Sequence, residues 1–458
     1  SDHQINFLNQ AFGNKATQTE PRAVWPHAPS VYQKYLSLPQ TTASEDLWLA
    51  GHFEVHIQVI SSTQRPNTQD FFSFAYLAIR KANAVLDNDP QNAKAYRILG
   101  RTYYILGQFE KLIAGEQGGA ITSQRRHFQT VQAYSQALLI EPDHLPTLRR
   151  LLEIYVNQNK LDLSLELLDR IAVLTAGRTD ELDTAERSQQ QSENQIREML
   201  SGQFKAIVEQ LEEGKKQGIS PLQIASSAYQ KGCVLYALNL LDEDPESLAG
   251  NPQAQMFQAL LLTEAGRSQD ASDSMDRLEA VVEQYQGLKW RTQAAIISLA
   301  NARYPRAASL WRDEALQQEE LRLRTMLDML PFVSPGPEFF GRNADFSWPI
   351  QQTVTSVSTL IQAPDISTRL LFESALCHFE RGDNQTAESQ LRQILEIHPE
   401  TQLRQIVVTY LHLITDERFE IEPPSQRIPI SLDMFALDKG SQQEPTKELL
   451  EKKSEDQD

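Results

Sequence analysis

The amino-acid sequence predicts an all-α protein, a solenoid of antiparallel helix pairs. A pattern of small and bulky residues recurs in a frame of 34 residues, and glycine and proline mark the ends of its helices. A second observation is that no pair of clearly alternating segments is present, so no β-sheet is expected.

The first repeat is clearest in the stretch Ala93–Gln108, "AKAYRILGRTYYILGQ". Helical spacing places Tyr96, Leu99 and Tyr103 on one face, with Gly100 among them. A glycine inside a helix costs about 1 kcal/mol relative to alanine. We therefore expect Gly100 to face a neighbouring helix that packs too close to leave room for a side chain.

With Ala93 as position 1, Gly100 and Gly107 are positions 8 and 15 of the frame. The second helix of this repeat supplies positions 20, 24, 27 and 32, which are Thr130, Tyr134, Ala137 and Pro142. Between the two halves lie 18 extra residues, which we interpret as a loop inserted near 111–129. The next repeat is uninterrupted and contains Leu148, Leu151, Leu152, Tyr155, Asn159, Ser164, Leu168 and Ile171.

Later copies of the pattern follow the same frame. The strongest contains Leu371, Ala375, His378, Gly382, Ala387, Leu391, Ile394 and Pro399. Weaker central copies align Ala225, Ala228, Gly232, Ala237 and Leu241; Ala259, Leu262, Gly266, Ala271, Met275 and Leu278; and Ala295, Ala302, Ala307 and Trp311.

These residues resemble the tetratricopeptide repeat, with Tyr96 in place of its first tryptophan. The resemblance is clear over about 85–175 and 368–415 and degenerate between. It implies a right-handed superhelix, because one helix pair cannot bury its apolar face without stacked neighbours. It also implies a non-catalytic scaffold that binds a protein or peptide partner in a groove lined by the first helix of each pair.

Composition divides the chain into seven parts. We expect an extended polar arm (1–44), an N-terminal repeat block (45–175), a polar hinge (176–194), a degenerate helical middle (195–330), an aromatic Pro/Gly loop (331–350), a C-terminal repeat block (351–418), and a linear segment with a charged tail (419–458). Residues 52–60 alternate like a strand, but we predict a helix because a lone strand would have no partner.

Several function classes fit the composition poorly. The net charge of −18 argues against nucleic-acid binding, and no run of 18 apolar residues predicts membrane insertion. Cys233 and Cys377 lie in apolar helical stretches and are expected to be buried thiols. Because the chain begins at Ser1 without a leader, we interpret it as a processed chain or a region of a larger, exported or membrane-tethered one.

Catalytic and metal-binding motifs were not found. "LEEGKKQG" lacks the first glycine and the Ser or Thr of a phosphate loop. His52 and His56 share a helix face, but "HFEVH" is not a zinc motif and no third ligand is evident. We therefore expect no cofactor and no metal.

The resemblance assigns positions 2, 5, 9 and 12 of each first helix to the groove. Together with their neighbours these are Lys94, Arg97, Arg101, Tyr104, Arg149, Arg150 and Asn157. Arginines in a groove suit an acidic peptide, through forked hydrogen bonds to carboxylates. The alternative is that the arginines pair within the chain, with acids such as Glu110 and Glu153.

The aromatic loop supplies a second candidate interface, Phe339, Phe340, Phe346 and Trp348. These side chains either cover the apolar end of the solenoid or anchor a partner. Two rival hypotheses remain open. One is an enzyme or glycan-binding accessory protein that uses the loop with Glu338, Arg342 and Asp345, and the other is a homodimer formed through the solenoid end.

Overall fold

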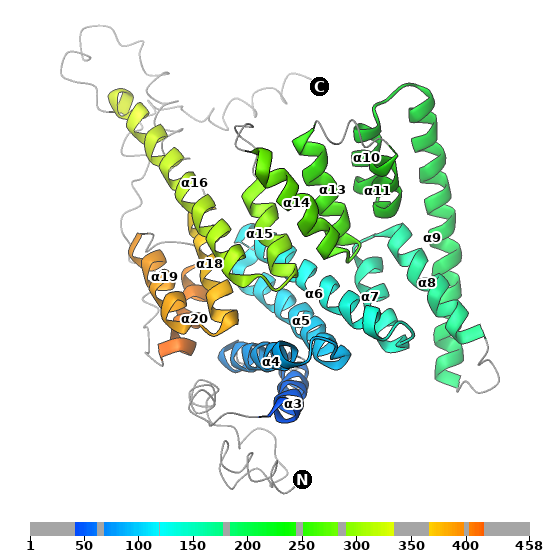
Figure 1. Ribbon diagram of the computed structural model, residues 1–458, viewed down its shortest axis with the longest axis horizontal. Coiled ribbons are helices and arrows are strands. Elements are labelled where there is room, and N and C mark those ends of the chain that lie inside the picture. The colour runs from blue at the N-terminus through cyan, green and yellow to red at the C-terminus, as the bar shows by residue number, and fades with distance from the viewer. Residues whose placement is uncertain are drawn as a thin grey trace, which may run out of the picture. The chain divides into compact units, whose positions relative to one another are not determined.

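The computed structural model describes residues 42–61, 68–118, 120–176, 184–243, 251–282, 290–333, 366–397 and 403–415. Helices and turns make up these ranges, and no strand occurs within them. Residues 1–320 and 364–419 form one compact unit (Figure 1). In the second unit, 321–363 and 420–458, only the last turns of one helix are described.

The prediction of an all-α helical repeat protein is confirmed, because most helices come in consecutive antiparallel pairs (Figure 1). The paired helices are α3 (Ala43–Ser61) with α4 (Thr68–Asn88), α5 (Ala93–Gly118) with α6 (Ala120–Ile140), α7 (Leu145–Asn157) with α8 (Leu161–Ala176), α10 (Pro221–Gln230) with α11 (Val234–Asp242), α13 (Pro252–Glu264) with α14 (Ser268–Val282), α15 (Trp290–Ala300) with α16 (Tyr304–Val333), and α18 (Ile366–Arg381) with α19 (Asn384–Ile397). A long helix, α9 (Thr184–Lys216), follows α8, and α20 (Arg404–Thr415) follows α19.

The turn inside five of these pairs has one repeated geometry. Its position-15 residue has a positive φ in each case: Asn159, Gly232, Gly266, Ala302 and Gly382. In each turn the next backbone N–H donates to the carbonyl five residues earlier, at 2.8 or 2.9 Å, as in a Schellman C-cap. The 34-residue frame read from the sequence therefore locates the turns, in the degenerate central copies as well.

Small residues allow the paired helices to approach closely. A Cβ atom on Gly100 would lie 2.9 Å from ring atoms of Tyr134, which confirms that this glycine faces a neighbouring helix. At position 20, Ala237, Ala271 and Ala307 are fully buried. Packing at these sites offsets the low helix propensity of Gly100.

The predicted loop at 111–129 is wrong, because α5 continues to Gly118 and α6 begins at Ala120. The 18 inserted residues lengthen both helices of the pair instead of interrupting it. A burial requirement explains this. Arg125 and Arg126, on the inserted turns of α6, are fully buried, and a Cβ on Gly107 would lie 2.8 Å from the Cβ of Arg126.

The predicted hinge at 176–194 is wrong over 184–194, which form the start of α9. The buried carboxylate of Glu193 accepts a hydrogen bond from Arg149 Nε at 2.7 Å, which ties this polar helix to α7. Residues 52–60 are helical, as predicted. The extended arm predicted at 1–44 is wrong at 43–44, which begin α3, and the loop predicted at 331–350 is wrong at 331–333, which end α16. The rest of the arm (1–41), the rest of the aromatic loop and the tail (419–458) lie outside the described residues.

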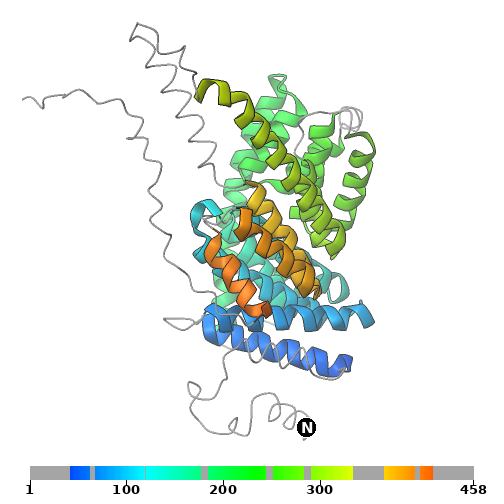
Figure 2. The same cartoon turned by 90° about the vertical axis from the view of Figure 1, so that its left-hand side faces the viewer.

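The C-terminal helices pack against the N-terminal ones, as both views show (Figures 1 and 2). One hydrophobic cluster joins α3–α5 to α18–α20 and includes Phe71, Phe72, Phe372, Phe379 and Tyr410. Helices more than 250 residues apart in the sequence therefore share a core.

A buried network of charges crosses this junction. Arg125 donates from Nη1 to Glu373 Oε2 at 2.7 Å and from Nη2 to Glu380. Arg126 forms a forked pair with Glu110, both bonds 2.8 Å, and also donates to Glu380. Two guanidinium groups thus satisfy three carboxylates drawn from α5 and α18.

Tyrosine hydroxyls extend this network. Arg126 Nη2 donates to the Tyr76 hydroxyl at 2.8 Å, and Tyr410 donates to Glu110 Oε1 at 3.0 Å. The two hydroxyls are 2.8 Å apart. Burial is the main reason that the pKa of each phenol is raised, so both remain neutral hydrogen-bonding groups.

Replacing Arg126 with methionine should lower the free energy of unfolding by about 3–5 kcal/mol, because it leaves buried carboxylates unpaired. Urea denaturation followed by circular dichroism measures this loss. The matched control is Arg150→Met, since Arg150 is 51% exposed in its pair with Glu153 and should cost less than about 1 kcal/mol. Equal losses in the two variants would contradict a stabilising role for the network.

Gly232→Ala should be more destabilising than Gly382→Ala, although both residues are position 15 of a repeat and have positive φ. At Gly382 a Cβ meets no atom within 4 Å, so only backbone strain of about 1–2 kcal/mol applies. At Gly232 the Cβ would lie 1.9 Å from the carbonyl oxygen of Asn159, which adds about 1–3 kcal/mol. Thermal and urea unfolding of the two variants tests the difference.

Candidate peptide-binding groove

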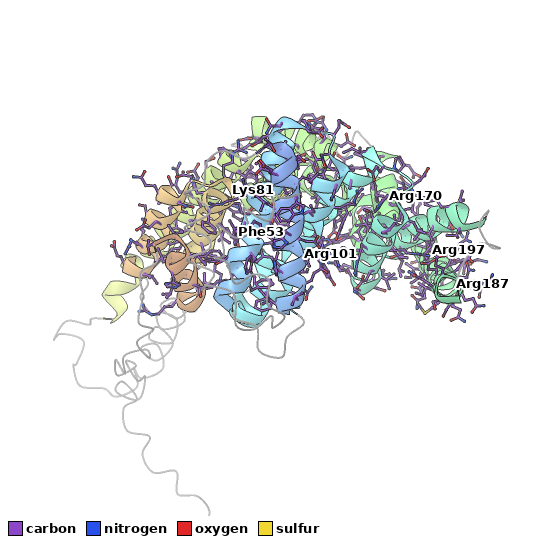
Figure 3. The ribbon with its side chains drawn as sticks, turned by 90° about the horizontal axis from the view of Figure 1, so that it is seen from below. Phe53, Lys81, Arg101, Arg170, Arg187 and Arg197 are labelled. Atoms are coloured by element: carbon purple, nitrogen blue, oxygen red, sulfur yellow. The ribbon has the colours of Figure 1, made fainter. Side chains whose placement is uncertain are left out.

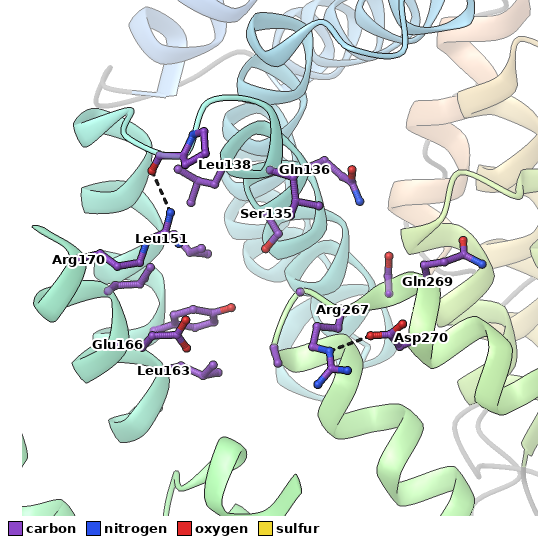
Figure 4. Close-up of a pocket in the computed structure, with 17 residues that line it drawn as sticks. Ser135, Gln136, Leu138, Leu151, Leu163, Glu166, Arg170, Arg267, Gln269 and Asp270 are labelled. Atoms are coloured by element: carbon purple, nitrogen blue, oxygen red, sulfur yellow. Dashed lines mark hydrogen bonds and ion pairs between the residues drawn. The ribbon is translucent and has the colours of Figure 1, made fainter. Parts of the chain in front are cut away.

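A groove of about 570 Å³ opens between α6, α7 and α8 on one side and the α13–α14 turn on the other. Figure 4 shows Leu163, Glu166 and Arg170 across from Arg267 and Asp270, with α6 between them. The lining residues are Ser135, Gln136, Leu138, Leu139, Pro142, Leu151, Tyr155, Leu163, Glu166, Leu167, Arg170, Ala265, Gly266, Arg267, Ser268, Gln269 and Asp270.

Leucines form the inner wall of the groove. Leu138, Leu151, Leu163 and Leu167 are buried members of the larger hydrophobic core. Leu139 differs from them, because 70% of its surface is exposed to solvent. The groove therefore presents an apolar side chain at its mouth in continuity with the core.

Polar groups form the rim. Arg267 Nε donates to Asp270 Oδ2 at 2.8 Å, and Arg170 Nη2 donates to the carbonyl of Pro142 at 2.9 Å (Figure 4). Gln136 and Gln269 add side-chain amides, which both donate and accept hydrogen bonds. Such a rim can satisfy the N–H and C=O groups of a peptide backbone while the leucines contact its apolar side chains.

A buried ion cluster around Glu264 holds the α13–α14 wall in place. The carboxylate of Glu264 pairs with His127 Nε2 at 3.0 Å and accepts from Lys160 Nζ and the Tyr229 hydroxyl, both at 3.1 Å. Its backbone carbonyl accepts from the hydroxyl of Tyr155 at 3.0 Å. Helices α6, α7 and α10, together with Lys160 in the turn before α8, are thereby joined to the last residue of α13.

Burial by itself would raise the pKa of the Glu264 carboxyl. The hydrogen bond from His127 and the charges of His127 and Lys160 outweigh it and lower the pKa to about 2. The group is therefore ionised throughout the neutral and mildly acidic range, and it forms charge-assisted bonds inside the protein.

A close backbone approach brings this wall against α6. Gly266 has φ +73°, and a Cβ there would lie 2.1 Å from Ser135 Oγ. Only glycine allows both the left-handed turn and this contact. The frame position of Gly266 is visible in the sequence, but its approach to Ser135 is not.

The structure divides the predicted arginine cluster into separate ion pairs. Arg97 pairs with Glu141, and Arg149 pairs with Glu193. Arg101 Nε lies 3.1 Å from Glu54 Oε1.

Arg101 and Arg150 are the two predicted arginines that act on the same groups. Burial raises the pKa of Glu54 and of Tyr134, and the charges of both arginines oppose this rise. Arg150 itself pairs with Glu153 at 2.7 Å. Figure 3 places Arg101 beside α3, with Arg170, Arg187 and Arg197 further along on α8 and α9. Intramolecular pairing, the alternative foreseen from the sequence, holds for all four predicted arginines.

The other predicted site residues differ in position. Lys94 and Asn157 are exposed, and Tyr104 packs partly against the core. The aromatic candidates Phe339, Phe340, Phe346 and Trp348 lie outside the described residues.

His52 and His56 contact each other through Nε2 atoms 3.0 Å apart. Burial and the charge of His52 lower the pKa of His56 to about 4. Within the described ranges, no group of three or more His, Cys, Asp or Glu side chains is placed to hold a metal ion, and no helix is long and apolar enough to cross a membrane.

Both cysteines are buried, as predicted, and neither is in a disulfide. Burial is the first cause that raises the pKa of each thiol to about 12.

Sequence reasoning missed Leu139, Arg170 and Glu264. Weak signals existed for two of them. Leu138 and Leu139 are adjacent and cannot both face the core on one helix. Glu264 follows three leucines and a threonine and is the only charged residue in 252–264. Their shared location depends on contacts more than 100 residues apart in the sequence.

No family model and no curated protein matches this chain. Among solved structures, the TPR domain of P58(IPK) aligns with 90% of this chain and 99% of its own at 11% identity, with a TM-score of 0.26. The assignment to an all-α helical repeat fold rests on the repeated helix pairs and their turns.

Replacing Glu264 with glutamine should remove the contribution to the free energy of unfolding that depends on ionisation of its carboxyl group. The folded-state pKa of about 2 lies below the ordinary value of 4.5, so this stabilisation is full above about pH 4.5 and is lost as the pH falls toward 2. The gap in unfolding free energy between wild type and Glu264→Gln should narrow by about 1 kcal/mol from about pH 5.5 to 3.5. Urea titrations across this range measure the gap. Glu153→Gln, at an exposed carboxylate, controls for the general effect of a Glu-to-Gln change. A gap for Glu264→Gln that does not change with pH would contradict the assignment.

Proposed function

We propose that this protein is a non-catalytic interaction scaffold that binds a peptide segment of a partner protein in the groove between α6–α8 and the α13–α14 turn. The observation that carries the proposal is the wall of core leucines that ends at the exposed Leu139. Water contacts this side chain in the free protein, and a partner's apolar side chain would release that water.

The surroundings of the leucine wall favour a peptide over a purely apolar ligand. Ser135, Gln136 and Gln269 contribute hydroxyl and amide groups at the rim. A peptide backbone has unpaired donors and acceptors that need such partners when they leave water. The ion cluster at Glu264 and the contact at Gly266 hold the two walls before binding, which reduces the entropy lost on association.

The arginine cluster predicted from the sequence is a less favourable site for binding a peptide. An acidic segment bound at Arg97, Arg101, Arg149 or Arg150 would have to displace carboxylates that already pair with them. Binding there would exchange one ion pair for another, with little net gain. An acidic peptide at that surface stays a prediction, as does a homodimer.

Leu139→Asp should weaken peptide binding at least about tenfold, because it places a charge where an apolar contact forms. Peptides selected from a random phage-displayed library against the wild-type chain provide the ligands, and fluorescence anisotropy measures their Kd. Since Leu139 is exposed, the variant should fold normally, which thermal unfolding checks.

The matched control is Leu316→Asp, because Leu316 on α16 is also a large exposed apolar side chain, 61% exposed, and does not line the groove. It should leave the Kd unchanged. If no peptide is selected, or if both variants bind as the wild type does, the groove is not the binding site.

A further inference from the structure

Arg170 and Glu166 lie one turn apart on α8 at the groove mouth, and neither has an oppositely charged partner in the part of the chain that the structure describes. Glu166 is exposed and Arg170 is half-buried. Figure 4 shows both side chains on the same wall of the groove, Arg170 near Leu151 and Glu166 near Leu163.

This arrangement differs from that of neighbouring charges. Arg197 pairs with Asp169 at 2.6 Å, and Arg267 pairs with Asp270 at 2.8 Å. Arg170 and Glu166 have the four-residue spacing that commonly gives an ion pair on a helix, but no such pair forms. Arg170 instead donates from Nη2 to the carbonyl of Pro142, which orients the guanidinium group beside the groove. Within the ranges that the structure describes, its other N–H donors have no hydrogen-bond acceptor.

We infer that the groove recognises a peptide with one acidic and one basic side chain on the same edge, flanked by apolar residues. The inference rests on the proposed function of the groove. The acidic side chain would bind Arg170, and the basic one would bind Glu166. Complementary charges at fixed positions set the register and direction of a bound segment.

The spacing suits an extended peptide. Residues four apart on a helix are separated by about 6 Å along its axis, and residues two apart in an extended chain by about 6.6 Å. Alternation in an extended peptide directs residues at every second position to one side and those between to the other. Apolar residues would then face Leu138 and Leu139 of α6, while the charged pair faces α8 at the mouth.

An array of 400 immobilised peptides, GGLxLxLGG with every combination at the two variable positions, tests this. We expect the full-length wild-type chain to bind best where one variable residue is acidic and the other is basic, in one order. The reversed order should bind about fivefold more weakly. Solution Kd values for the two orders, measured by fluorescence anisotropy, confirm the ranking.

Variants assign the two contacts separately. Arg170→Gln should remove the preference for the acidic residue, and Glu166→Gln the preference for the basic one. The double variant Glu166→Arg with Arg170→Glu should invert the preferred order, which loss of folding cannot imitate. The exposed Arg187 on α9 lies outside the groove, and Arg187→Gln should change nothing.

Two failures are distinguishable. Binding that is lost in Leu139→Asp but shows no charge preference, or a preference unaltered by the double variant, overturns this inference and leaves the groove as the binding site. Binding that is the same in Leu139→Asp as in the wild type overturns the proposed function and this inference together.

Discussion

The buried pairing of Arg125 and Arg126 with three glutamates is the constraint on which the rest of the structure depends. A guanidinium group removed from water costs several kcal/mol unless carboxylates and hydrogen bonds satisfy it. Glu110 comes from the same helix pair, whereas Glu373 and Glu380 come from α18, about 250 residues later. The N-terminal pairs therefore cannot reach their low-energy state without the C-terminal helices. The 18 residues that lengthen α5 and α6 have a physical role in this, because they carry the two arginines to α18.

The next residue along α6 links the same helix to the middle of the chain. His127 contacts Glu264 on α13, while Arg125 and Arg126 contact α18, because successive residues point in different directions around a helix. Three consecutive side chains thus connect α6 to two parts of the fold that are distant in sequence. The end of α13 is thereby tied to α6 through His127 and to Lys160, which precedes α8, and these elements form the two sides of the groove.

Charged side chains have different partners in the groove and in the arginine cluster predicted from the sequence. At the α5–α7 surface the arginines are neutralised by nearby acids, which stabilises the packing of neighbouring helices but leaves little free energy for a ligand. At the groove, Arg170 is positioned by a backbone carbonyl, and no carboxylate of the described residues pairs with it. A charged group that is already oriented and has no such partner gains more free energy from a ligand, because its side-chain freedom was already lost on folding.

The sequence by itself determined the local architecture. Helical periodicity, the small residues at positions 8 and 20, and the turn residue at position 15 act through contacts within one helix pair, and these are encoded within a single 34-residue frame. Tertiary structure decided what those contacts could not. The helical insertion at 111–129 and the helical start of α9 follow from burying charged side chains against distant helices, which local polarity does not reveal. The candidate groove is likewise a product of long-range contacts, because Leu139, Arg170 and Glu264 acquire their roles only when α6, α8 and α13 meet.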